Sequence, residues 1–421
     1  MTAVETSSHS SISPEQCAIA PELEFSGPCG QRYFFYVVTN PCELLPLQQA
    51  WQDLADRTTD PNPFYEPWFF LPAAKHFGQD QQWRLLLVYA EDLKKPGARE
   101  LCGFFPFVKT GKPFSPSRWT LWKNSFCYLT SPLIDRHRVA PVLRAVAHFL
   151  RQFPEGPACV EFPMMAGEGA LYHGFTEILR ENLSTTFTPD QYLRATTTCH
   201  RDVDDYLKHA LGGHHVREYR RKRRKLEAIG QLEYRSMREP RLADCWTNWF
   251  LDLEAQGWKA RAGTAIKQHP DQVQFFRQMI ENGLQAGKVY LEGLFLDGEP
   301  IALKCILLAK PVAFAFKIAF DESHSSCSPG VQLEFESLRQ LADDKEIAWC
   351  DSCAIPGHQM IDRIWLERRV VRHLIVSTGR VTGDVVIGSL PLFRALNRVR
   401  KRWGETLGGN AGGKRWGETL G

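Results

Sequence analysis

The sequence predicts an α/β fold of two tandem units, each with a mixed, largely antiparallel sheet flanked by helices. Two observations carry this prediction. Over residues 32–190, short apolar runs bounded by glycine, proline and charge alternate with helix-like segments. Over residues 200–385 the order is helices, hairpin strands, a glycine loop, a helix and a further strand. The length of 421 residues is enough for two or three domains.

The N-terminal unit is expected over residues 31–195, after a disordered leader at 1–30 that is rich in Ser, Pro and Glu. Its first strand is the β-rich run that begins at Arg32, because aromatic and β-branched residues favour strands. The remaining elements are a helix at 43–57, a helix beginning near Trp68, strands at 83–90, 101–108 and 159–162, and a helix at 140–152.

The C-terminal unit is expected over residues 196–385. Asp297-Gly298 between two apolar runs is a strong hairpin signal. The expected helices are 200–229, 240–256, 271–286 and 331–343, and the expected strands are 289–296, 301–308, 312–320 and 347–350. The tail at 386–421 holds a basic amphipathic helix at 391–403 and a flexible part in which the octapeptide from Lys401 recurs at Lys414.

The composition excludes several classes of protein. Apolar residues make up 43% and charged residues 24%, as in ordinary globular domains, so a disordered chain and a collagen-like fibre are excluded. A formal net charge of +3 is low for a protein that coats nucleic acid by bulk charge. No apolar run reaches the roughly 18–20 residues that span a bilayer, and no signal peptide is recognisable. We expect a cytoplasmic protein.

The 12 cysteines are expected to be free thiols, because their spacing shows no disulfide framework. Cys350 and Cys353 form one Cys-x-x-Cys pair. A structural zinc site needs a second pair of ligands at suitable spacing, and the sequence offers none beyond His358. We therefore expect no metal.

The loop before the helix at 331–343 is the most informative stretch. Ser328-Pro-Gly ends a Ser-rich loop that follows a strand, and the first N–H groups of a helix have no partner and attract an anion. Gly330 would let a phosphate approach the backbone closely. The alternative is an ordinary capped turn.

Three further stretches carry charge or exposed polar groups. Lys317 lies inside an apolar strand and must find a carboxylate or a ligand phosphate, with Asp321 or Glu292 as structural partners. Seven of the nine residues from Arg217 to Lys225 are Lys or Arg, so this segment could bind tRNA, the phosphates of CoA or a polyanionic polysaccharide. The alternative is a solvated helix face. A polar Gly-rich loop is either a substrate-binding loop or a surface turn with its tryptophan in the core; its residues are Trp258, Lys259, Arg261 and Thr264.

Several motifs together resemble one superfamily. They are Gly257-Trp-Lys-Ala-Arg-Ala-Gly-Thr-Ala, Lys317-Ile-Ala-Phe-Asp-Glu, Ser328-Pro-Gly-Val, His358-Gln-Met-Ile-Asp-Arg-Ile-Trp and, in the first half, Asn62-Pro-Phe-Tyr-Glu-Pro-Trp. Over about 60–390 the chain resembles the GNAT superfamily, and within it the FemAB-like branch with CelD- and BioF2-type acetyltransferase domains.

The resemblance implies two GNAT-like units with an acyl-CoA, most simply acetyl-CoA, bound in the second. The donor would be held by the splayed strand and the loop after it, at Phe316, Ile318, Ser328, Gly330, Val331 and Gln332. The common superfamily loop is Arg/Gln-x-x-Gly-x-Gly/Ala, whereas this chain has Cys327-Ser-Pro-Gly-Val-Gln. FemAB relatives take aminoacyl-tRNA as donor, so charged tRNA stays an alternative.

The implied activity is transfer of an acyl group from a thioester to an amine on a small molecule, sugar or envelope precursor. Such a transfer needs a base, an acid and donors for the developing oxyanion. The candidate catalytic residues are Asp351, His358, Asp362 and Lys317. A non-catalytic binding or assembly protein in polysaccharide biosynthesis stays open, as do a homodimer and peripheral membrane contact through 391–403.

Overall fold

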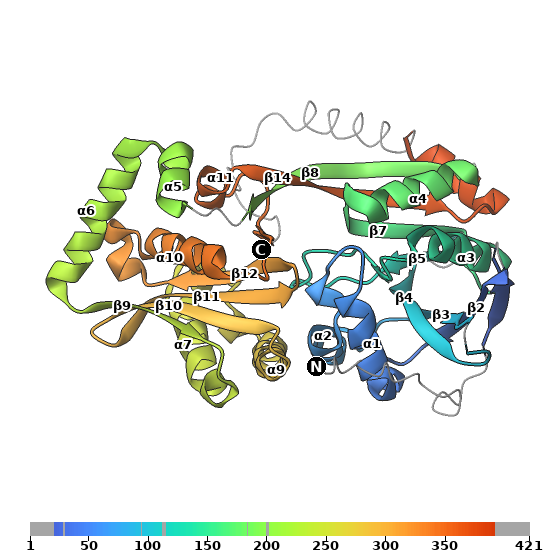
Figure 1. The fold of residues 1–421 in the computed structure, drawn as a ribbon, viewed down its shortest axis with the longest axis horizontal. Helices are drawn as coiled ribbons and strands as arrows, with labels where there is room; N and C mark the ends of the chain where they lie inside the picture. Colours follow the sequence, from blue (N-terminus) through green and yellow to red (C-terminus); the bar gives the residue numbers. More distant parts are fainter. Residues whose placement is uncertain are drawn as a thin grey trace, which may run out of the picture.

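The computed structural model describes residues 21–391 apart from 28–29, 94, 112–114, 183 and 199–201. Its strands form one mixed sheet through both halves of the molecule, in the order β1-β2-β3-β4-β5-β7-β14-β8-β13-β12-β11-β10-β9, with β6 beside β4 (Figure 1). The pairs β5–β7 and β12–β13 are parallel and the other named pairs are antiparallel. The predicted fold class is confirmed.

The elements of the first half lie between residues 23 and 198. The strands are β1 (Leu23–Ser26), β2 (Arg32–Val38), β3 (Trp83–Glu91), β4 (Arg99–Thr110), β5 (Arg118–Leu121), β6 (Leu133–Ile134), β7 (Cys159–Ala166) and β8 (Thr186–Thr198). The α-helices are α1 (Gln48–Asp56), α2 (Pro67–Phe77), α3 (Val139–Gln152) and α4 (Gly169–Glu181), with short 3-10 turns at Pro41–Leu47 and Pro63–Tyr65.

The elements of the second half follow from residue 203. The helices are α5 (Val203–Leu211), α6 (Gly213–Ile229), α7 (Ala243–Gln256), α8 (Trp258–Arg261), α9 (Pro270–Gln285), α10 (Pro329–Asp343) and α11 (Ile361–Ile364). The strands are β9 (Leu232–Met237), β10 (Val289–Leu296), β11 (Glu299–Ala309), β12 (Val312–Phe320), β13 (Trp349–Asp351) and β14 (Glu367–Ser377). Short 3-10 turns lie at Pro240–Leu242, Ile266–Gln268 and Glu322–Cys327.

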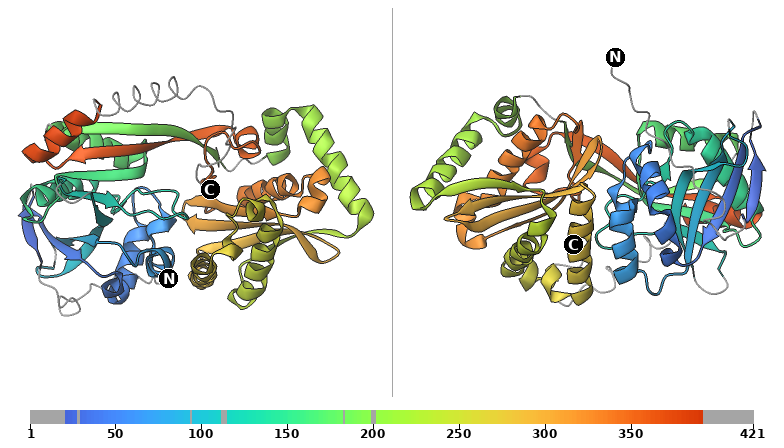
Figure 2. Two further views of the ribbon diagram at one scale, coloured as in Figure 1. Left: turned by 180° about the vertical axis from the view of Figure 1, so that it is seen from behind. Right: turned by 60° about the horizontal axis from the view of Figure 1, so that its bottom comes forward.

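Each half covers its part of the sheet with helices on both faces. In the first half α3 and α4 lie over one face and α1 and α2 over the other (Figures 1 and 2). In the second half α5, α6 and α10 lie opposite α7 and α9. The apolar stripe predicted for the helix at 331–343 is confirmed: Phe335, Leu338 and Leu341 are buried and Val331 is half-buried.

The two halves share strands and one core. β14 is formed near the end of the described chain but pairs with β7 and β8, and β8 continues along the sheet to pair with β13. On the far side of the sheet α2 packs on α9, where the rings of Phe69 and Phe275 are 5.3 Å apart. The junction between the halves is therefore a packed interior, and the site described below lies at this junction.

Glu161 links three strands of the first half. From β7 it accepts hydrogen bonds from Arg118 of β5 (3.0 Å) and contacts His373 of β14 (2.6 Å). Burial raises the pKa of Glu161, but the bonds from His373 and Arg118 outweigh this and lower it to about 2. The carboxylate therefore stabilises the fold above its unfolded pKa near 4.5, by about 3 kcal/mol, and this contribution is lost as the pH falls towards 2.

We expect urea unfolding at a series of pH values to show this loss between pH 4.5 and 2. Glu161→Gln should lower the free energy of unfolding at neutral pH and flatten the acid limb of the plot of this free energy against pH. Glu155, whose side chain is 73% exposed, supplies the matched control in Glu155→Gln. Identical acid limbs in the wild type and Glu161→Gln would contradict the assignment.

Local signals explain where several elements begin and end. Asp297 and Gly298 both have positive φ (51° and 87°), so the predicted hairpin turn between β10 and β11 is confirmed. The single helix expected at 200–229 is wrong, because Gly212 (φ 81°) separates α5 from α6. Residues 23–26, assigned from the sequence to the leader, form β1.

No described helix has the length and apolar character needed to cross a bilayer.

Part of the expected tail cannot be compared with the structure. Residues 381–391 are helical, but 392–421, including most of the expected amphipathic helix and the repeated octapeptide, lie outside the described residues.

Candidate active site

β12 and β13 separate shortly after they begin. They pair only over Val312–Phe314 and Trp349–Asp351, and β12 then continues to Phe320. From residue 315 onward, this edge of β12 has no partner strand among the described residues. A free strand edge presents backbone N–H and C=O groups that can bond the amides of an extended ligand.

A β-bulge stands in β12 just beyond this point. Ala315 pairs with Ile306 and Lys317 with Cys305, so Phe316 is the extra residue. Phe314, Phe316 and Ala319 consequently pack into the core between the two halves, and Lys317 lies on the same side. The bulge brings the cation of Lys317 to the junction.

Lys317 is surrounded by aromatic rings rather than by carboxylates. Its Nζ lies 4.7 Å from the ring centroid of Phe126 and 3.3 Å from the hydroxyl of Tyr128. No described carboxylate forms an ion pair with it, so the pairing expected with Asp321 or Glu292 is wrong. Burial lowers the pKa of Lys317, and the negative charge of the nearby Glu254 offsets this only in part.

Asp321 and Glu292 have other environments. Asp321 caps the turn after β12 and pairs with His324 at 3.1 Å. Glu292 is fully buried, near the ion pair of Lys304 and Glu334 (2.8 Å), and burial raises its pKa. That ion pair is on the side of α10, where Glu334 also accepts the indole N–H of Trp365 at 2.9 Å.

Tyr128 comes from the first half and completes this cluster. It lies in the loop between β5 and β6, and its ring is half-buried with the hydroxyl near Lys317. Burial raises the pKa of Tyr128, so the hydroxyl keeps its proton well above neutral pH. Sequence reasoning missed Tyr128, because nothing local marks it and its contact with Lys317 joins residues 189 positions apart.

The polar loop at α8 lies against the end of β12. Together with Ile318, Ala319 and Phe320, the segment 257–259 lines a small pocket of about 30 Å³. Glu322 accepts bonds from the backbone N–H of Trp258 (2.6 Å) and from Arg261 (2.8 Å). The structure thus brings the expected substrate-binding loop and the expected donor strand together.

The side chains of this loop have distinct roles. The indole of Trp258 is 54% exposed, so the alternative of a core tryptophan is wrong. Lys259 donates to the buried Glu254 at 2.7 Å, and Glu254 also accepts the N–H of Ile266 at 2.9 Å. Thr264 bonds back to the carbonyl of Lys259 and stabilises the loop itself.

The N-terminus of α10 meets the end of β12. Ser328 is left-handed (φ 54°), and Lys222 of α6 donates to its hydroxyl at 3.1 Å. A Cβ on Gly330 would lie 3.3 Å from the ring of Phe320, which leaves little room for a side chain. Val331 and Gln332 each donate a backbone N–H to the carbonyl of Ser328, at 3.1 Å. The side chain of Gln332 is buried and bonds the carbonyl of Tyr219, so it holds α6.

Asp351 is enclosed by cations. It has no exposed surface; one oxygen accepts a bond from Arg369 at 3.0 Å, and the other lies 3.5 Å from Arg194 and accepts the N–H of Cys353 at 2.8 Å. Arg369 also reaches Asp60 of the first half at 3.3 Å. Two buried guanidinium groups share this carboxylate, and such an enclosed ion pair favours a structural role over that of a base.

His358 and Asp362 are used locally around α11. Asp362 accepts the N–H of Gly357 at 2.7 Å, and His358 Nδ1 accepts that of Ile361 at 3.3 Å. Ile361 packs with the α5 and α10 core, on the face of the sheet opposite Lys317. No described hydrogen bond or ion pair joins either residue to the junction cluster of Lys317 and Tyr128.

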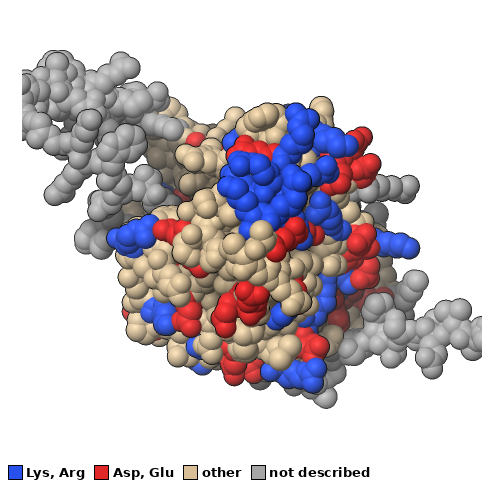
Figure 3. Space-filling view, turned by 90° about the vertical axis from the view of Figure 1, so that its left-hand side faces the viewer, with Lys and Arg blue, Asp and Glu red and all other residues tan. Residues whose placement is uncertain are grey.

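The cations of α6 divide into two groups. Arg220, Lys222 and Arg223 pair with acidic residues. Four others form no ion pair within the described residues and stand on the exposed side of the helix, where Lys and Arg gather in Figure 3; they are Arg217, Arg221, Arg224 and Lys225. This basic surface is one helix wide.

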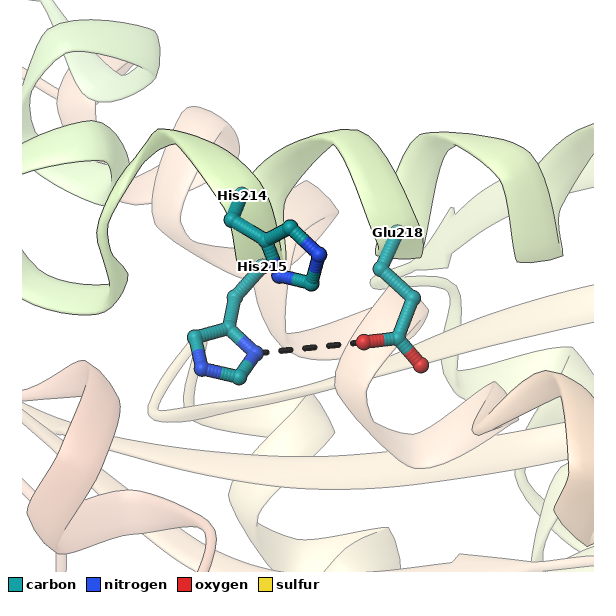
Figure 4. A group of neighbouring side chains, drawn as sticks. All are labelled: His214, His215 and Glu218. Atoms are coloured by element: carbon teal, nitrogen blue, oxygen red, sulfur yellow. Dashed lines mark ion pairs between the residues drawn. The ribbon is translucent and has the colours of Figure 1, made fainter.

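One group in the described part of the chain could hold a metal ion: His214, His215 and Glu218 at the start of α6, with ligand atoms within 4.8 Å of one another (Figure 4). Lys222 lies 3.4 Å from Glu218, and the positive end of the helix dipole is at this turn. Both features disfavour a bound dication. Cys350 and Cys353 are free, buried thiols outside this group.

Residues 213–357 match the family described as acetyltransferase (GNAT) domain. This stretch runs from α6 to the loop after β13 and so includes the free edge of β12, the α8 loop and the N-terminus of α10.

Several solved structures align with this chain at low sequence identity. FemX aligns with a TM-score of 0.51 and 8% identity, covering 78% of this chain and 95% of that one. A conserved protein of unknown function from Bacteroides thetaiotaomicron aligns with a TM-score of 0.48 and 12% identity, covering 78% of this chain and 97% of that one. A tandem GNAT protein from the clavulanic acid biosynthesis pathway aligns with a TM-score of 0.39 and 12% identity, covering 83% of this chain and 99% of that one. No curated protein matches the chain.

Proposed function

We propose that this chain, whose residues 213–357 form a GNAT-type acetyltransferase domain, is an N-acyltransferase that binds its donor along the free edge of β12. The observation that carries this proposal is the separation of β12 from β13 beside the α10 N-terminus. An acyl-CoA would place its amides on the free edge and its diphosphate near Gly330 and Lys222. The amine acceptor would enter between the α8 loop and β12.

The junction cluster supports a direct attack. The nitrogen of a neutral amine attacks the thioester carbonyl carbon, a C–N bond forms, and the C–S bond breaks. Backbone N–H groups near the bulge of β12 stabilise the oxyanion. Tyr128 gives its proton to the leaving sulfur, Lys317 supplies a proton to Tyr128, and the new amide nitrogen loses its extra proton to water. Asp351, His358 and Asp362 take no part in this scheme.

The protonated form of Lys317 is the active one in this scheme, so activity should fall as pH rises through its pKa. Burial lowers that pKa below the usual 10.5, so we expect the alkaline limb of kcat to begin below the usual range of lysine. Lys317→Arg should remove this limb and lower kcat, because arginine stays charged and does not give up its proton. An alkaline limb unchanged by Lys317→Arg would exclude this lysine as the proton supplier.

The donor is tested by thermal shift of the full chain with CoA, acetyl-CoA and longer acyl-CoAs. A ligand at 100 times its Kd adds about 2.7 kcal/mol of stability if it binds the native state alone. Gly330→Asp puts a carboxylate where the diphosphate would lie and should abolish the shift. Gly330→Ala adds only the Cβ and is the steric control, and Gly388→Asp adds the same charge at an open, distant position. A shift that survives Gly330→Asp would contradict this donor site.

A second donor class, aminoacyl-tRNA, is favoured by Arg217, Arg221 and Arg224 of α6, which are exposed and have no ion-pair partner among the described residues. Charged tRNA should then bind with strong salt dependence, and each lost phosphate contact should reduce the log–log slope by about 1. Arg221→Gln with Arg224→Gln tests this, and Arg241→Gln, also exposed, is the control. If neither CoA thioesters nor charged tRNA bind, a non-catalytic binding protein would be favoured.

A further inference from the structure

A cavity of about 310 Å³ lies in the first half, between α3, α4 and the sheet. None of its lining residues belongs to β12, α8 or α10, so it is separate from the proposed donor site. In Figure 1 the two helices are at the right of the molecule, whereas β12 is near its centre. Nothing in the proposed acyl transfer uses this cavity.

The floor and walls of the cavity are apolar. β4, β7 and β14 supply Phe107, Phe162 and Val376 at the floor, and α3 and α4 supply Val146 and Ile178 at the walls; all five are buried. Protein interiors are normally close-packed, and a dry apolar space of this size has a strong affinity for an apolar ligand.

The buried polar groups of the cavity already have partners within the chain. Thr378 donates to the carbonyl of Pro157 at 2.7 Å, and the hydroxyl of Ser377 accepts the N–H of Gly379 at 3.1 Å. The buried part of a ligand therefore needs no hydrogen-bonding group, and a polar one would find few partners. This favours a hydrocarbon chain over a sugar or a nucleotide.

The rim of the cavity is polar and carries one unneutralised charge. Arg144 and Glu181 form a two-bond ion pair at 2.7 and 2.9 Å across the gap between α3 and α4, so their charges cancel. Arg151 is exposed at the end of α3 and forms no ion pair within the described residues. A carboxylate would thus find its partner at Arg151 while an attached chain enters the cavity.

The geometry points to a binding site for a single-chain anionic amphiphile, most simply a fatty acid, with its chain between α3 and α4 and its carboxylate at Arg151. Ala147, half-buried on α3, stands at the wall of this fatty-acid site. The site needs no thioester and is independent of the acyl transfer proposed above.

The first test is calorimetric titration of the full chain with straight-chain fatty acids of increasing length, each below its micelle concentration. The Kd should tighten about fourfold per methylene, since each contributes about 0.8 kcal/mol, until the cavity is full, and then level off. The stoichiometry should be one per chain. The primary alcohol of the same length should bind about tenfold more weakly, because it lacks the charge for Arg151. Equal binding of acid and alcohol, or no gain with chain length, would overturn the proposal.

Matched variants locate the site. Ala147→Phe fills the cavity and should weaken binding by more than about tenfold, whereas Ala147→Ser leaves the space open and should bind as the wild type does. Arg151→Gln should weaken binding of the fatty acid until its Kd equals that of the primary alcohol. Arg180→Gln removes an exposed arginine of α4 that does not line the cavity, and should have no effect. Unchanged binding by Ala147→Phe would overturn the proposal.

A labelling experiment on the unaltered chain removes any dependence on how the variants fold. A fatty acid with a diazirine in its chain should label peptides of α3, α4 or the floor strands β4, β7 and β14 after irradiation, and excess unlabelled acid should prevent this. Labelling confined to other peptides would overturn the assignment.

Discussion

Replacing Tyr128 with phenylalanine should lower kcat by about 10²–10⁴-fold, the usual contribution of a general acid. The half-buried ring would keep its packing against Phe64 and Phe316, so the change removes only the hydroxyl near Lys317. Single-turnover kinetics with the identified donor would measure the effect on the chemical step, and titration would show an unchanged donor Kd.

Two comparisons make this result interpretable. Tyr172→Phe removes the hydroxyl of a half-buried tyrosine on α4 and should leave kcat unchanged. A donor with a better leaving group should recover much of the loss in Tyr128→Phe, because such a thiolate needs less protonation. A Tyr128→Phe protein with full kcat would rule out this hydroxyl as the acid.

Asp351→Ala should lower the free energy of unfolding by about 3–5 kcal/mol, the cost of breaking a buried ion pair. The alanine would leave Arg194 and Arg369, which are nearly fully buried, without their shared carboxylate. Urea denaturation with an unchanged m-value would measure the effect. The half-buried Asp362 provides the control, since Asp362→Ala removes one hydrogen bond from the N–H of Gly357 and should cost about 1 kcal/mol.

This prediction separates the two roles considered for Asp351. If Asp351 has only this structural role, the folded fraction of Asp351→Ala should keep its kcat, whereas loss of a catalytic base would abolish it. A double-mutant cycle with Arg369→Ala should show a large interaction energy, because the two side chains are in direct contact at 3.0 Å.

Local signals in the sequence were sufficient for most of the second half. The strands at 289–296, 301–308 and 312–320 follow from apolar runs and from one dipeptide that favours positive φ. The helix at 331–343 follows from its period of apolar residues. Each of these depends only on neighbours a few residues away.

The candidate site depended on contacts that a single sequence does not reveal. Tyr128, which lies beside Lys317, comes from a loop 189 positions earlier. Arg369, which pairs with Asp351, lies 18 positions later on β14, a strand that pairs with β7 of the first half. His358 follows the strand as expected but is on the far side of the sheet from Lys317. Sequence reasoning put Lys317 and His358 into one candidate site, whereas the sheet separates them in space.

The pairing of β14 with β7 and β8 has a consequence for synthesis on the ribosome. The first half lacks a central strand until residues 367–377 have emerged, so its sheet stays incomplete while the second half is being made. During that interval β7 and β8 expose unpaired edges that can join other chains. A nascent chain stalled before β14 would therefore be a target for chaperones, and release of the last strands would close both halves at once.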